Sequence, residues 1–156
     1  MSDLVSVARG RRPWEPAPGV RLHEVFNTYD GPLLGVIEED GVPYLFDCIY
    51  GHVESLSVWL YSRVPKPSLP VLERLEGDKF NEMVRKIQMR SPGRLALVVD
   101  GEGIVASADA VDFPNDLSNA LEELVRDHRQ TAERFRNTEG EVEDLESTAR
   151  RGLVPA

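Results

Sequence analysis

The feature that most constrains the fold is the pair Asp40 and Gly41, which lies between two strand-like segments. An Asp-Gly pair supplies both positive-φ positions of a tight hairpin turn. In residues 42–50, which follow the pair, apolar and aromatic side chains recur at every second position. This is the period of a half-buried strand. Residues 33–39 form the partner strand, so the sequence predicts a β-hairpin with its turn at Asp40.

Further strands are predicted on both sides of this hairpin. Period-two alternation continues over residues 55–64, and these three strands should form an antiparallel meander. Residues 95–99 and 104–108 flank the glycine-containing segment 100–103 and predict a second hairpin. Residues 21–27 fit either a strand or a helical turn, because Leu22, Val25 and Phe26 do not alternate strictly. We therefore expect a sheet of about five strands, a three-stranded meander plus a hairpin.

Two helices are predicted after the meander. Apolar residues recur at i, i+3, i+4 and i+7 from Phe80 to Ile87, which predicts an amphipathic helix over about 78–89. A second apolar stripe begins at Leu117 and predicts a long helix over 116–136. The fold class is therefore α+β, an antiparallel sheet packed with two main helices, of which the C-terminal one is long.

The ends of the chain differ in composition from this central domain. Residues 1–19 contain Gly10, three prolines and a short run of arginines, and they predict a flexible cationic arm. Residues 20–136 form the single α+β domain, and residues 137–156 form an acidic tail, as a frayed or partner-dependent helix.

A seven-residue spacing links the end of the long helix to the tail. It runs through Phe135, Val142 and Ala149, and Leu145 falls on the paired position of this weak heptad pattern. We expect these four residues to mediate self-association, as in a homodimer, or partner docking. The alternative is a helix docked wholly on its own sheet, followed by a disordered acidic tail.

Composition limits the classes of function. The formal net charge of −9 opposes binding to phosphate backbones and anionic membranes, so we expect no nucleic-acid binding and no membrane association. The single cysteine excludes an internal disulfide framework. Together with the absence of a signal peptide, it predicts a cytoplasmic protein. Residues 21–60 contain seven acidic residues against one arginine, which predicts an acidic hairpin surface.

No motif for a phosphate loop, a metal site or a nucleophile elbow occurs, so we expect no cofactor and no metal. The one cluster with nucleophilic chemistry is Cys48 with Asp47 and His52, and it could include His23. Alternation places Asp47 and Cys48 on opposite faces of the strand. Cys48 shares its face with aromatic residues, so a buried packing role is expected for it.

Four short motifs resemble a family of small uncharacterised bacterial domains of unknown function, and the resemblance covers about residues 22–90. That family opens with a Tyr-Asp-Gly-Pro hairpin. The motifs here are Tyr29-Asp30-Gly31-Pro32-Leu33-Leu34, the Asp40-Gly41 turn, Tyr44-Leu45 and Trp59-Leu60-Tyr61. The arm and the acidic C-terminus depart from the family pattern. The resemblance implies a compact bacterial domain and carries over no catalytic residue.

These observations favour a non-enzymatic bacterial protein-interaction module of an accessory, inhibitory or immunity type, with a protein as its partner. The expected contact surface consists of Tyr29, Asp30, Glu38, Glu39, Asp40, Trp59 and Tyr61. Two alternatives stay open. One is a small hydrolase or transferase that uses Cys48. The other is a regulator that binds nucleic acid through the arm and the basic helix, or mimics nucleic acid with its acidic face.

Overall fold

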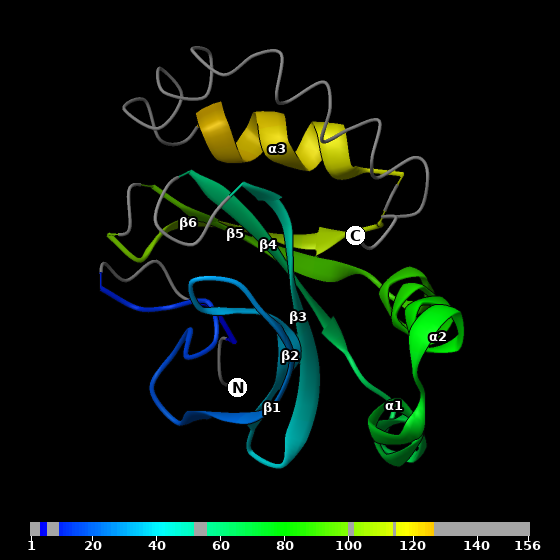
Figure 1. The fold of residues 1–156 in the computed structure, drawn as a ribbon. Helices are drawn as coiled ribbons and strands as arrows, with labels where there is room; N and C mark the ends of the chain where they lie inside the picture. Colours follow the sequence, from blue (N-terminus) through cyan, green and yellow to red (C-terminus); the bar gives the residue numbers. More distant parts are fainter. Residues whose placement is uncertain (1–3, 6–9, 52–55, 100–101, 114, 127–156) are drawn as a thin grey trace.

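The computed structural model describes residues 4–5, 10–51, 56–99, 102–113 and 115–126. Its centre is a six-stranded antiparallel sheet in which the strands follow one another in sequence order. The strands are β1 (Val20–Thr28), β2 (Pro32–Glu39), β3 (Val42–Gly51), β4 (Ser57–Arg63), β5 (Gly93–Val98) and β6 (Ile104–Val111). A short 3₁₀ turn (Lys66–Ser68) and helices α1 (Leu69–Arg74) and α2 (Gly77–Arg90) connect β4 to β5, and α3 (Leu117–Arg126) follows β6. Figure 1 shows the sheet bending around the N-terminal segment.

The α+β class and the central hairpin are confirmed. Asp40 and Gly41 have φ angles of 51° and 76°, and Glu39 pairs directly with Val42 across this two-residue turn. The pair therefore adopts the left-handed backbone that a tight hairpin turn requires.

The expected count of about five strands is too low by one, because residues 20–28 form the strand β1. The pairing of β1 with β2 is irregular, with register shifts between Leu22 and Glu24 and again between Val25 and Asn27. Each shift adds a residue on one strand and reverses the side on which the following residues lie. These bulges remove the period of two from the sequence, which is why the segment also fits a helical turn.

Both faces of the sheet are covered over its central strands. On one face, here called the helical face, α1 and α2 pack on residues such as Val36 and Leu45, and α3 packs on Val58 and Leu60. The opposite face, here called the concave face, presents Ile37, Phe46, Trp59, Tyr61 and Ala96. Six of the seven residues of β4 are buried, as expected for a strand with a layer on each side.

The N-terminal arm covers the concave face. Leu4, Val5 and Ala17 are buried there, and the ring of Trp14 packs edge-on against Trp59 with 6.2 Å between the centroids. The Tyr61 hydroxyl donates a hydrogen bond of 2.8 Å to the carbonyl of Pro13. The prediction of a flexible arm is therefore wrong for described residues 4–5 and 10–19, which belong to the folded domain.

The C-terminal helix is shorter than expected. It spans ten residues, Leu117–Arg126, in place of the predicted 116–136. Its stripe of Leu117, Ala120, Leu121 and Leu124 is buried against the helical face of the sheet. Residues 127–156, including the predicted tail, lie outside the described residues. Within the described residues, no helix is both long enough and apolar enough to cross a membrane.

Candidate interaction surface at the edge of the sheet

Trp59 and Tyr61 do not belong to a contact surface. Their side chains are 0% and 1% exposed, and the Trp59 indole N–H donates to the hydroxyl of Ser57 at 2.9 Å. Alternation in a strand predicts that one of its faces is exposed to solvent. In β4 the arm covers that second face, so the side chains on it are buried. Their inclusion in the predicted surface is therefore wrong.

The five other predicted residues fall on two separate turns. Tyr29 and Asp30 precede β2, whereas Glu38, Glu39 and Asp40 lie at its far end. Eight residues of strand extend about 26 Å at 3.3 Å per residue, so the two groups do not form one patch. Glu39 is also buried, with 7% exposure. The sequence predicts both turns, but the structure places them at opposite ends of β2, so they do not form one contact surface.

A different surface lies along β1, at the end of the sheet. The described residues contain four exposed large hydrophobic side chains, and three of them are Leu22, Val25 and Tyr29, with 38%, 36% and 61% exposure. Leu22 and Val25 lie on β1, and Tyr29 begins the turn that follows it. The fourth is Met89 on α2. We call the surface of Leu22, Glu24, Val25 and Tyr29 the β1 edge.

The first bulge of β1 places Leu22 and Val25 on the same face, although they are three residues apart. Leu22 pairs with Ile37 and Val25 pairs with Gly35. Ile37 belongs to the concave-face cluster, and a Cβ at Gly35 would face the ring of Phe46 in the same cluster. Directly opposed residues of paired strands point to the same side of a sheet. The two exposed side chains therefore extend the apolar concave face to the end of the sheet.

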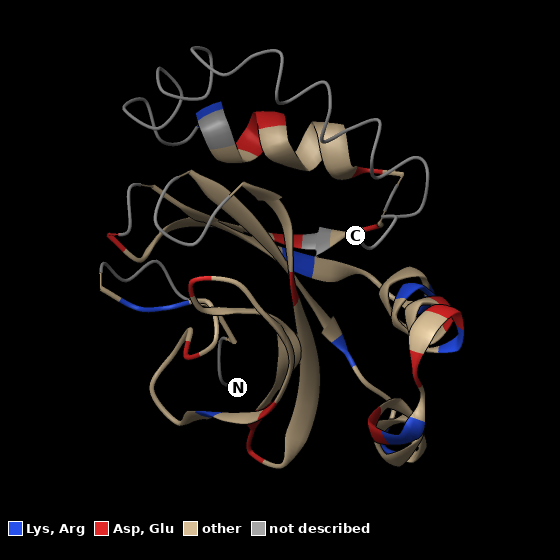
Figure 2. Ribbon diagram, viewed as in Figure 1, with Lys and Arg blue, Asp and Glu red and all other residues tan. Residues whose placement is uncertain are grey.

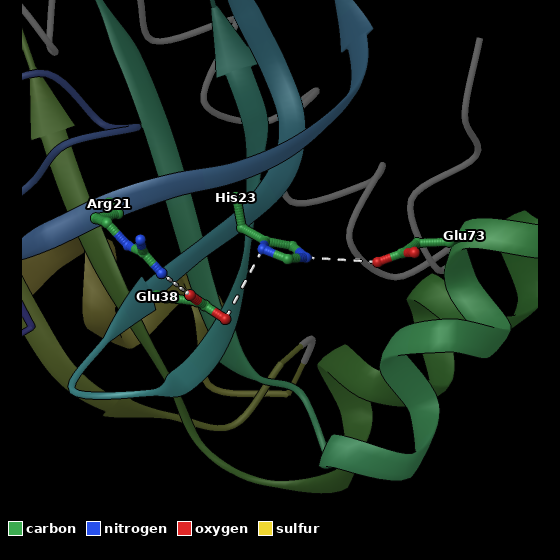
Figure 3. A network of polar contacts seen from close by, with 4 residues as sticks. All are labelled: Arg21, His23, Glu38 and Glu73. Carbon is green, nitrogen blue, oxygen red and sulfur yellow. Dashed lines mark hydrogen bonds and ion pairs between the residues drawn. The ribbon is translucent and has the colours of Figure 1, made fainter.

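The other face of β1 is polar and is tied to its neighbours. The Arg21 guanidinium lies 2.7 Å from Glu38 of β2. His23 lies between two carboxylates, with its Nδ1 3.8 Å from Glu38 and its Nε2 3.4 Å from Glu73 of α1 (Figure 3). Phe26 adds an edge-on ring contact with Phe80 of α2 at 5.0 Å between centroids. These contacts fix β1 against β2 and the helices from one side.

Sequence reasoning did not select Leu22, Val25 or Glu73. The available signal was weak: apolar residues with irregular spacing in a short segment that ends in turn formers. His23 was considered only as a partner for Cys48, and it contacts Glu38 and Glu73. No cluster of three or more potential metal ligands occurs in the described part of the chain.

Cys48 packs against the concave-face cluster, as its alternation with aromatic residues predicts. Its Sγ is 3.5 Å from the carbonyl of Tyr50 and 3.8 Å from that of Gly51. Burial, together with the nearby charge of Asp47, raises the pKa of the Cys48 thiol to about 12. A thiol in this environment stays protonated and is a poor nucleophile at neutral pH.

Asp47 lies on the helical face and contacts α2. Its Oδ2 accepts a hydrogen bond of 2.6 Å from Nε2 of Gln88, which is 1% exposed. Burial raises the pKa of Asp47 to about 6, and the hydrogen bond from Gln88 opposes this shift. The amide oxygen of Gln88 is buried without a hydrogen-bond partner among the described residues. This pair links β3 to α2, with the side chain of Gln88 buried and that of Asp47 half-buried.

The outer side of α2 carries a second surface feature. A shallow hollow of about 400 Å³ is lined by Glu82, Arg85, Lys86, Met89 and Arg90. Figure 2 shows charged residues of both signs on α1 and α2, whereas the ribbon of the strands is mostly uncharged. The mixed charges fit an ordinary solvated helix face.

Several predicted residues lie outside the described part of the chain. These are the candidate docking residues Phe135, Val142, Leu145 and Ala149, together with His52. Comparison with known protein families, curated proteins and solved structures finds no match to this chain.

Proposed function

We propose that this chain is a non-enzymatic bacterial protein-interaction module, of an accessory, inhibitory or immunity type, that contacts its partner through the β1 edge. One observation carries the proposal: two of the four exposed large hydrophobic side chains of the described residues, Leu22 and Val25, lie close together on one face of the end strand, and a third, Tyr29, follows in its turn. Exposed apolar side chains that cluster at one place are typical of protein contact sites.

The surroundings of the exposed residues support a contact role. The contacts of Arg21, His23 and Phe26 hold β1 on its polar face, so Leu22 and Val25 are presented on a fixed backbone. A fixed surface loses little conformational entropy when a partner binds. The raised pKa of Cys48 gives the competing hydrolase or transferase hypothesis no activated nucleophile at that residue.

Capture experiments with matched variants test this proposal. The bait is the full chain, immobilised and exposed to a bacterial lysate, with bound proteins identified by mass spectrometry. The double variant Leu22→Lys/Val25→Lys should lose the partner, because it places two charges in the apolar contact. Met89→Lys changes a hydrophobic residue that is also exposed, at 55%, and should retain the partner.

Equal thermal melting of the three proteins shows that the fold is intact. Retention of the same partner by the double variant contradicts the proposal. Loss of the partner on Met89→Lys alone moves the contact to α2 and supports a partner that recognises its charged face.

A further inference from the structure

The two ends of the sheet differ in how their backbone edges are covered. At the β6 end, the amide of Ile104 donates to the carbonyl of Arg11 at 2.8 Å, and the amide of Gly10 donates to the carbonyl of Glu102 at 2.8 Å. The chain's own arm therefore runs beside the beginning of β6. β1 is the opposite end strand, and β2 is its neighbour in the sheet. β1 is nine residues long, and most of it is exposed.

The side chains of β1 separate into two kinds. Leu22 and Val25 continue the apolar concave face, as their pairing with Ile37 and Gly35 shows. On the opposite face lie Arg21 and Glu24 of β1, with Glu38 of β2 and Glu73 of α1 beside them. Three carboxylates against one guanidinium make this polar face acidic, with His23 between two of them.

This division defines the chemistry of a neighbouring strand. Residues of an added strand alternate between the two faces of the sheet. Its residues on the concave side would meet Leu22 and Val25 and should be apolar. Its residues on the other side would meet the acidic face and should be lysine or arginine.

Resting on the proposed function, we propose that β1 binds its partner by strand addition: a short extended segment that alternates apolar with basic residues pairs with the β1 edge. In this recognition mode the main chain provides affinity and alternate side chains provide specificity. The occupant is a segment of another protein whose charge complements the acidic residues of the edge.

The bulges of β1 favour a short segment over a long strand or a second copy. Three register shifts occur between Leu22 and Thr28, and each one increases the local twist. A twisted edge resists pairing with the flat edge of another sheet. A flexible segment of a few residues can follow the twist, so the partner is expected to supply a tail or loop.

The test uses defined peptides and NMR titration of the isotope-labelled full chain. The probe is a seven-residue peptide of alternating lysine and valine. One control replaces every lysine with glutamate, and the other carries N-methyl groups on alternate amides of the lysine peptide. We expect saturable shifts of backbone amides in β1 with the lysine peptide and with neither control.

Variants of the chain separate the two kinds of contact. Val25→Lys and Glu24→Lys should each weaken binding of the lysine peptide by about tenfold, which corresponds to about 1.4 kcal/mol. Met89→Lys should leave it unchanged. Shifts that avoid β1, or equal binding of the N-methylated peptide or the glutamate peptide, overturn strand addition. A dimer that dissociates on Leu22→Lys overturns it as well, because the occupant is then a second copy.

The peptide and capture experiments fail in distinguishable ways. If partner capture depends on Leu22 and Val25 while no peptide shifts β1, strand addition is wrong and the proposed function stands. If neither capture nor peptide binding depends on these residues, both proposals are wrong.

Discussion

The two edge strands of the sheet, β6 and β1, differ in how far other segments of the chain cover them. At the β6 end, the arm pairs with the beginning of the strand and α3 packs on the helical face, and Ile104, Ala106 and Val111 are buried. At the β1 end, the polar face is tied to α1 and α2, whereas Leu22 and Val25 remain more than one-third exposed. Burial beyond the central strands is therefore decided by which segments return to cover them.

Removal of the arm should have the largest effect on stability, because it uncovers the concave face of the sheet. Deletion of residues 1–19 takes away Leu4, Val5, Trp14 and Ala17, and it exposes Trp59 and Tyr61 on the concave face. Each large buried side chain that loses its cover costs about 1.5–3 kcal/mol, so the loss approaches the whole stability of a domain of this size. Circular dichroism during urea titration should show no cooperative transition. A cooperative transition close to that of the full chain would show that the arm adds little to the stability of the domain, as expected for a flexible arm.

One titratable residue of β3, Asp47, tests whether stability depends on pH in the covered middle of the sheet. The pKa of Asp47 is raised from 3.8 to about 6. The folded state thus holds its proton more tightly than the unfolded state, so stability is full below pH 4 and falls as the pH rises to about 6. The shift corresponds to about 3 kcal/mol. Because Asp47 is only half-buried by surface area, we expect a loss of about 2 kcal/mol.

Asp47→Asn should remove this pH dependence. Its amide can accept from Gln88 Nε2 and donate to the unpaired Gln88 oxygen, so at pH 8 the variant should be about 2 kcal/mol more stable than the parent chain. At pH 3.5 the difference should be small. Urea titrations at the two pH values measure it, and Asp40→Asn at the exposed hairpin turn controls for the loss of one negative charge. An equal gain at both pH values contradicts a proton-linked origin.

Tyr61→Phe sharpens the comparison by weakening one contact of the arm. The variant keeps the buried ring but removes the donor to the Pro13 carbonyl. One lost hydrogen bond with a buried acceptor left unpaired costs about 1–2 kcal/mol. Thermal unfolding should detect this loss, and Tyr44→Phe on the half-buried part of the same face should have less effect. Identical melting of the parent chain and Tyr61→Phe would show that this hydrogen bond does not hold the arm.

The smallest effect is expected at the β1 end. His23→Gln removes the contacts with Glu38 and Glu73, which involve partly exposed side chains. Such pairs contribute about 0.5 kcal/mol or less, so the urea midpoint should hardly change at neutral pH. A loss above about 1.5 kcal/mol would show that the docking of α1 depends on this histidine.

The elements that could be predicted from the sequence are those with local causes. The Asp40-Gly41 turn depends on the backbone preferences of two adjacent residues, and α2 depends on a helical period within fourteen residues. β1 was ambiguous because its bulges become visible only through its pairing with β2.

The contact surface was harder to predict, because exposure depends on segments that are distant in sequence. Alternation in β4 is the same whether solvent or the arm covers the side chain of Trp59. The prolines and glycines of the arm exclude regular structure, and described residues 10–19 contain no helix or strand before Val20. They do not exclude burial, however, and Leu4, Val5 and Ala17 are buried in irregular backbone.

The position of the arm also has a consequence for the order of events during synthesis. The arm is synthesised before the strands that form its binding site. The carbonyl of Val5 accepts from Arg94, 89 residues further along, and Arg11 meets Ile104. Contacts of such long sequence separation form late and slow the folding of a domain. A nascent chain that ends before β6 therefore lacks the backbone that pairs with Gly10 and Arg11, and the arm cannot complete its cover of the aromatic side of the sheet until β6 has been made.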